Sequence, residues 1–129
     1  MNYFHSKRIA GTTVEAIRPK VEEALKSEGF GVLTEIDIKA TMKKKLDKEY
    51  LPHLILGACN PVYADKVLSV EPTISTMLPC NVTLRQLESG EIEVAIINPI
   101  AAMGSVGNKN LETHAGEVNE KLKRVLNAI

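Results

Sequence analysis

The sequence has no tryptophan, only two cysteines and no excess of charge of either sign. Its 16 basic and 16 acidic side chains give a formal net charge of zero. A dedicated nucleic-acid-binding protein needs a basic surface that displaces counterions from phosphates, so the neutral balance argues against that class. No run of apolar residues approaches the ~18 that a membrane-spanning helix needs. We therefore expect neither a nucleic acid nor a membrane as a partner.

The first eight residues contain no apolar run of the kind that forms a secretory signal. Two cysteines in a chain without such a signal are expected to be reduced thiols rather than a structural disulfide. We therefore expect a cytoplasmic protein. A composition of 44% hydrophobic and 25% charged residues is ordinary for a globular protein. The length of 129 residues suits a single domain that spans residues 1–129.

The spacing of apolar residues predicts the order of strands and helices. Strands are expected at 3–9, 32–40, 54–58, 81–87 and 92–97, and helices at 12–29, 41–48, 61–71 and 111–129. This order, β-α-β-(α)-β-α-β-β-α, predicts an α+β fold with helices packed on an antiparallel or mixed sheet. Alternate residues from Val32 to Ile38 are expected to face the core, which makes that strand half buried. The helix at 41–48 is strongly charged and is expected on the surface.

Local signals predict where two of the helices begin. Thr12 and Glu15 have the spacing of a capping box, in which each side chain bonds to the other residue's backbone N–H. Pro19 falls in the second turn of a helix that begins there, so that helix either bends or becomes regular later. Asn60 and Pro61 give the clearest helix start, because asparagine caps free N–H groups and proline at the first position has no N–H to lose.

Glycine marks two of the connections between elements. Gly90 lies in the short polar link 88–91, which predicts a hairpin between the last two strands. Residues 101–110 contain glycine without a clear periodicity, so we expect a mobile loop there. Gly104 and Gly107 do not form a phosphate-binding loop, because they are three residues apart and no Lys-Ser or Lys-Thr follows.

Two Cys-Asn pairs, Cys59-Asn60 and Cys80-Asn81, each stand at the boundary between a strand and a less regular segment. Cys59 immediately precedes a predicted helix N-terminus, whose dipole and free N–H groups lower the pKa of a thiol. If the two strands are neighbours, Cys80 approaches Cys59, and two such thiols bind a soft metal or form a redox pair. Free cysteine is also among the most buried residue types, and inert packing is the commoner case.

The three histidines, His5, His53 and His114, are scattered through the chain. Histidine is commonly a partly exposed side chain, so each is expected to lie at the surface. His53 stands six residues before Cys59. That separation spans ~20 Å along an extended strand, so the two residues are not expected to share a metal.

Several segments together resemble the domain-of-unknown-function family DUF302. They are Leu56–Pro61, Glu71-Pro72 and Leu78–Val82, supported by Gly29–Leu33 and Ile36–Ile38. The two cysteines match a cysteine-bearing branch of that family. The resemblance implies a curved, mainly antiparallel sheet with helices on one face, like half of a TATA-binding protein, and a homodimer. It implies no activity, because function resides in sites rather than in folds.

The residues leave three functions open. The leading hypothesis is a binding module rather than an enzyme, in which Cys59 and Cys80 hold a soft transition metal or a small sulfur-reactive ligand. Asn60 and Asn81 would shape the turns or donate hydrogen bonds beside the thiols. The alternative is a thiol redox enzyme or switch, with Cys59 as nucleophile and Cys80 as resolving thiol. The third is a structural or protein-interaction domain with inert cysteines.

Overall fold

A computed structural model describes residues 2–129. Its centre is a five-stranded sheet in the order β1-β5-β4-β3-β2, and every neighbouring pair is antiparallel. The strands are β1 (Phe4–Ile9), β2 (Gly31–Asp37), β3 (His53–Cys59), β4 (Cys80–Gln86) and β5 (Ile92–Ile97). The helices are α1 (Val14–Ser27), α2 (Ile38–Leu46), α3 (Pro61–Val70), α4 (Pro99–Met103) and α5 (Lys109–Asn127), with short 3₁₀ helices η1 (Pro72–Met77) and η2 (Gly104–Val106).

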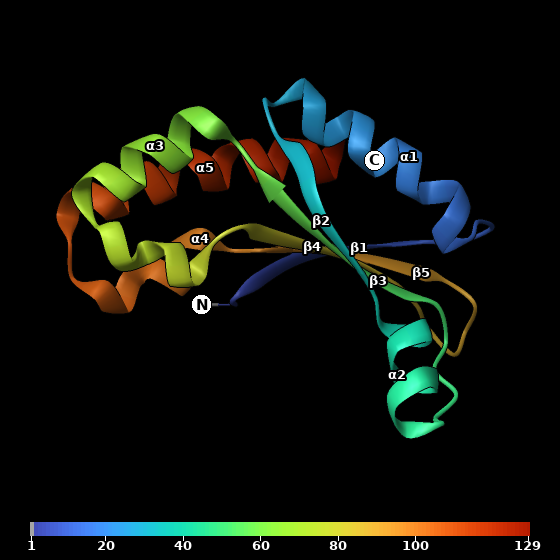
Figure 1. Ribbon diagram of the computed structural model, residues 1–129. Helices are drawn as coiled ribbons and strands as arrows, with labels where there is room; N and C mark the ends of the chain where they lie inside the picture. The colour runs from blue at the N-terminus through green and yellow to red at the C-terminus, as the bar shows by residue number, and fades with distance from the viewer. Residues whose placement is uncertain (1) are drawn as a thin grey trace.

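The helices α1, α3 and α5 cover one face of the sheet, and α2 projects from the sheet on its own (Figure 1). The α+β class, the antiparallel sheet and the one-sided helical layer are thus confirmed. The predicted hairpin is also confirmed, because β4 and β5 pair directly and Gly90 adopts a φ of 91° between them. Within residues 2–129, no helix is long and apolar enough to cross a membrane.

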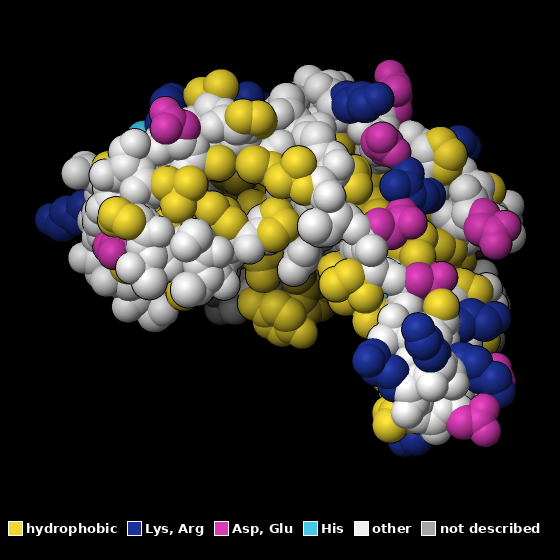
Figure 2. Space-filling model, viewed as in Figure 1, with side chains coloured by type: hydrophobic (Ala, Val, Ile, Leu, Met, Phe, Trp, Pro, Cys, Tyr) yellow, Lys and Arg dark blue, Asp and Glu magenta, His cyan; other side chains and the backbone are white. Residues whose placement is uncertain are grey.

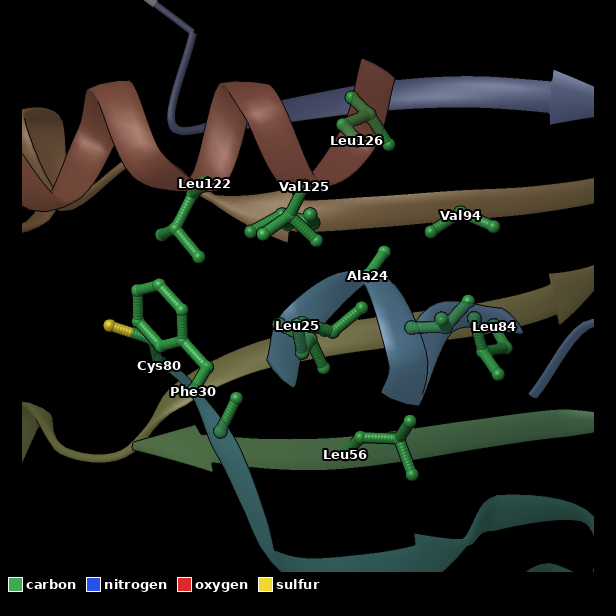
Figure 3. Packing of buried hydrophobic residues seen from close by; sticks show 14 of the residues in the cluster. Ala24, Leu25, Phe30, Leu56, Cys80, Leu84, Val94, Leu122, Val125 and Leu126 are labelled. Carbon is green, nitrogen blue, oxygen red and sulfur yellow. The ribbon is translucent and has the colours of Figure 1, made fainter. Parts of the chain in front are cut away.

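Alternation along the central strands separates the two faces of the sheet. On β4, Cys80, Val82 and Leu84 are buried beneath the helices, while Asn81 and Arg85 are exposed on the other face. Side chains directly opposite one another across a ladder share a face. The core therefore forms between the sheet and the inner sides of α1 and α5, where Leu25, Leu56, Leu122 and Val125 meet (Figure 3).

The first helix differs from its prediction at its start. Thr13, not Thr12, is the N-cap, and its hydroxyl oxygen accepts a hydrogen bond from the backbone N–H of Ala16 at 3.0 Å. The predicted pairing of Thr12 with Glu15 was therefore wrong by one residue. Pro19 lies inside the helix, which runs from Val14 to Ser27. Burial of the apolar face of α1 against the sheet stabilises the helix despite Pro19, because tertiary packing outweighs the low helix propensity of proline.

The second strand is not half buried as predicted. A β-bulge between Val32 and Thr34 breaks the alternation, and Leu33 is 68% exposed there. β2 is also an edge strand, so only β3 pairs with it. After the bulge, Glu35 lies on the helical face and its carboxylate accepts a hydrogen bond from Arg18 of α1. The period-two pattern in the sequence carries no sign of the extra residue.

The predicted mobile loop at 101–110 was wrong. That segment contains most of α4, all of η2 and the start of α5. Asn98 caps α4 by accepting hydrogen bonds from the N–H groups of Ile100 and Ala101, and Pro99 stands at the first helical position. This is the same Asn-Pro start as at Asn60, and it can be read from the sequence. Asn108 caps α5 in the same manner.

Gly57 of β3 lies where neighbouring segments come very close to the strand. A Cβ placed on Gly57 would lie 2.1 Å from Thr34 Oγ1 and 2.7 Å from Pro79 Cγ. Pro79 follows a cis peptide bond and leads directly into β4. Only glycine at position 57 therefore lets β2 and the turn before β4 close over β3.

We predict that Gly57→Ala lowers the free energy of unfolding by ~1–3 kcal/mol, the usual cost of forcing extra volume into a packed site. Urea denaturation followed by circular dichroism measures the change. Gly31→Ala is the matched control, because nothing lies within 4 Å of a Cβ at Gly31. Equal stability of the two variants would contradict the close approach at Gly57.

Candidate functional site

The two cysteines lie at adjoining ends of neighbouring strands. Cys59 is the last residue of β3 and Cys80 is the first residue of β4. Between them the chain forms α3 and η1, which begin and end beside the thiols. The β3–β4 ladder makes the two strands that carry the cysteines neighbours, which meets the condition for Cys80 to approach Cys59.

Asn60 holds the turn between Cys59 and α3 with both ends of its amide. The Oδ1 atom accepts a hydrogen bond from the N–H of Tyr63 at 3.4 Å, and Pro61 is the first helical residue, so the predicted cap is confirmed. The Nδ2 atom donates to the carbonyl oxygen of Glu28 at 3.3 Å. That carbonyl belongs to the turn after α1, so one side chain connects three segments around the thiols.

A pocket opens beneath α3, and both cysteines line it. Its other walls are almost wholly apolar and come from the turn after α1, β3, α3, the turn before β4, α4 and α5. They are formed by Phe30, Ala58, Asn60, Tyr63, Ala64, Val67, Leu78, Pro79, Pro99, Met103 and Val118. Figure 2 shows a hollow bordered by hydrophobic side chains below α3.

The pocket is narrow. It encloses about 410 Å³ when its open mouth is included, but only about 30 Å³ is open to the centre of a water molecule. The 30 Å³ value describes the space that a ligand can enter, because the 410 Å³ value also includes solvent outside the walls. One water needs ~10–15 Å³ on this measure, so the pocket takes an ion or a ligand of very few atoms.

Burial sets the chemistry of Cys80. Its side chain is 9% exposed, and its sulfur lies beside the ring of Phe30 (Figure 3). Removal from water, and to a smaller extent the nearby charge of Cys59, raises the pKa of the Cys80 thiol to about 11. Cys80 is therefore protonated at neutral pH. Cys59 is only half buried and is the more accessible thiol.

The register of the ladder opposes a disulfide between the two thiols. The residue directly opposite Cys80 is Ala58, and Cys59 is the next residue along β3. The two cysteines are therefore not a directly opposed pair, whereas a disulfide needs sulfurs only ~2.05 Å apart. Both cysteines are free thiols in the structure.

The structure places the other candidate residues away from the pocket. Asn81 is exposed on the helix-free face, opposite Gly57. His53 stands at the far end of β3 from Cys59, as predicted, and the Nε2 atom of His5 makes a 2.8 Å hydrogen bond with Oδ1 of Asn119. Among residues 2–129, no three His, Cys, Asp or Glu side chains are grouped to hold a metal ion.

Sequence reasoning missed most of the pocket wall. Phe30, Tyr63 and Met103 are distant in sequence and meet only through the packing of α3 and α4 against the sheet. Their apolar character predicts burial but not which cavity they border. The Asn98-Pro99 helix start was a usable signal, because it places α4 next to the pocket.

Comparison with known proteins places this site in a family. The model of the family "Domain of unknown function DUF302" matches residues 5–129. The chain belongs to this family. The crystal structure of an uncharacterized conserved DUF302 protein from Bacillus stearothermophilus is similar with a TM-score of 0.89 and 25% sequence identity, over 98% of this chain and 97% of that one.

The chain is also similar to an uncharacterized protein of Aquifex aeolicus (strain VF5). It is 26% identical over 94 residues, which are 73% of this chain and 59% of that protein. This chain thus aligns with less than two thirds of that relative's length. The resemblance drawn from the Cys-Asn-Pro and Leu-Pro-Cys segments is confirmed by the family match, whereas the cysteine-bearing branch stays a prediction.

The raised pKa of Cys80 predicts how stability depends on pH. The folded protein holds the thiol proton more tightly than the unfolded chain, whose cysteine pKa is near 9.0, and the folded value is about 11. The resulting stabilisation is complete below pH 9 and is lost as the pH rises from 9 to 11. Two pKa units correspond to ~2–3 kcal/mol.

Cys80→Ala tests this linkage. We expect urea denaturation between pH 8 and pH 11 to show a steeper loss of stability in the unaltered DUF302 protein than in the variant, by ~2–3 kcal/mol over the range. Comparing slopes cancels the titration of lysine and tyrosine side chains, which both proteins share. Parallel slopes would show that Cys80 is not shielded from water.

Proposed function

We propose that this DUF302 protein binds a soft metal ion between the thiols of Cys59 and Cys80. The observation that carries the proposal is that one narrow, apolar pocket is lined by both cysteines. Two thiols are the only soft ligands that such a wall offers beside the thioether of Met103. Thiolate and thioether ligands select Cu(I) and similar ions over the hard cations that prefer oxygen.

The size of the pocket supports an ion rather than an organic substrate. Space of about 30 Å³ for water centres is far below what a drug-sized molecule requires. A bridging ion also tolerates the register between Cys59 and Cys80 better than a disulfide does. At ~2.3 Å per metal–thiolate bond, an ion joins sulfurs ~4.6 Å apart, against ~2.05 Å in a disulfide.

The charges around Cys59 and Cys80 also favour a metal ion at the end of β3 and the start of β4. Metal binding replaces the proton on Cys80, and the resulting thiolate is unfavourable in an apolar wall unless a positive charge is close. The metal supplies that charge. The N-terminus of α3, directly after Cys59 and Asn60, adds the positive end of a helix dipole. We propose a cytoplasmic location, where both thiols stay reduced.

Anaerobic titration with Cu(I) against a chromogenic chelator tests the proposal. We expect one ion per chain, with an affinity that rises between pH 6 and pH 8, since bound metal displaces protons from thiols. Cys59→Ser and Cys80→Ser should each weaken binding by more than the ~10–100-fold that loss of an outer hydrogen-bond partner costs. Asn81→Ala, on the opposite face of the sheet, is the control and should bind normally.

Two results would contradict the metal site. Binding that persists in Cys80→Ser would place the ion elsewhere. Failure to bind Cu(I), together with a reversible loss of two hydrogens on mild oxidation, would favour the thiol redox function with Cys59 attacking and Cys80 resolving. Failure of both would leave the cysteines as packing residues.

We also propose that the protein forms a homodimer through β2 and α2. Five of the nine large hydrophobic residues exposed within residues 2–129 fall in this one stretch: Leu33, Ile36, Leu46, Tyr50 and Leu51. α2 buries none of its residues, and β2 offers an unpaired edge to a second strand. An edge strand of this kind pairs readily with its own copy across a two-fold axis.

Sedimentation velocity tests the dimer. Ile36→Lys and Leu46→Glu should shift the protein from dimer to monomer, because each places a charge in a buried apolar contact. Val62→Lys on α3 is the matched control, since Val62 is 61% exposed but lies outside this stretch. A monomeric unaltered protein at high micromolar concentration would contradict the proposal.

A further inference from the structure

The helix-free face of the sheet carries a second cavity, separate from the thiol pocket. It is larger, with about 450 Å³ open to water centres and about 890 Å³ including its mouth. It lies over β4 and β5, on the face opposite to Cys80. The size falls within the range of pockets that bind small organic molecules.

One side of the cavity is a row of charged and polar side chains set by strand register. Arg85 of β4 stands opposite His53 of β3 on one side and Glu93 of β5 on the other. Arg8 of β1 pairs with Glu93 from the far side, just outside the cavity. Within residues 2–129, Arg8 makes no ion pair.

The cavity is lined by one positive and one negative side chain, Arg85 and Glu93, which pair with each other. Arg85 donates from Nε and Nη2 to Glu93 Oε1 at 3.3 and 3.0 Å, and its remaining Nη1 makes no hydrogen bond within residues 2–129. Partial burial, and then the charge of Arg85, lower the pKa of His53, so this imidazole is neutral at pH 7. The Nη1 group of Arg85 is therefore left to pair with a negatively charged ligand group, and neutral His53 adds no charge beside it.

The opposite side of the cavity is aromatic and apolar. Phe4 is opposite Ile97 in the β1–β5 ladder, and Tyr3 packs against Phe4 with ring centroids 4.8 Å apart. Tyr3 is 69% exposed, so its ring is free to contact a ligand. Thr83 and Ala95, which stand opposite each other, form the floor between the two sides.

We propose that this cavity binds a small planar monocarboxylate, with its carboxylate on Arg85 and its ring against Tyr3 and Phe4. A guanidinium fork matches a carboxylate in shape and charge. Aromatic side chains pack favourably against a flat ring. A dianionic phosphate ester fits less well, because Glu93 would repel the second charge.

Benzoate is the probe, and ¹⁵N-resolved NMR titration is the measurement. We expect saturable shifts at the amides of Thr83, Arg85 and Ala95. Benzyl alcohol, which lacks the charge, and acetate, which lacks the ring, should each bind at least ~10-fold more weakly, the effect of ~1.4 kcal/mol. Arg85→Gln should weaken benzoate binding by a similar factor.

Two further variants test whether benzoate binds in this cavity, one that fills it and one control outside it. Ala95→Leu fills the floor without altering charge and should abolish binding even if Arg85→Gln fails to fold. Val62→Lys on α3 changes an exposed residue that lines neither pocket and should bind benzoate normally, so this variant separates loss of the cavity from a general loss of folding. Absence of saturable shifts, or equal binding by Ala95→Leu, would overturn the proposal. A change of oligomeric state in Ala95→Leu would also overturn it, by showing that a second chain covers this face.

Discussion

The side chain of Asn60 makes the two hydrogen bonds on which the thiol pocket depends. One caps α3 through Tyr63 and the other reaches the carbonyl of Glu28 after α1. The amide is close enough that a Cβ on Gly29, which has a φ of 84°, would lie 3.0 Å from its Nδ2 atom. These contacts connect the start of α3 to the end of α1 beside the last residue of β3, where Cys59 and Cys80 line the same pocket.

The two faces of the sheet provide contrasting chemical environments. Beneath the helices, removal from water keeps Cys80 protonated and makes the pocket suitable only for a ligand that compensates this desolvation. On the helix-free face, Arg85 and Glu93 stay partly exposed and pair in solvent, where their attraction is modest. The alternation of side chains along a strand places neighbouring residues in these two environments. Cys80 and Asn81, for example, are consecutive residues that face opposite sides of the sheet.

Local signals in the sequence were sufficient for most of the fold. The Asn60-Pro61 helix start, the hairpin at Gly90 and the strand ending at Cys59 depend on neighbouring residues, and each is confirmed. The bulge at Leu33 depends on pairing with β3, which no local pattern records. The pocket depends on helices that meet from distant parts of the chain, so the two cysteines were identifiable but their shared cavity was not.

The central claim is that Cys59 and Cys80 act together as ligands of one soft ion. X-ray absorption spectroscopy at the copper edge of the Cu(I)-loaded protein tests this directly, because it identifies the atoms bound to the metal. We expect a first coordination shell made of sulfur, reduced to a single cysteine sulfur in Cys59→Ser. A shell dominated by nitrogen or oxygen would contradict it, since the wall of the pocket offers no histidine or carboxylate.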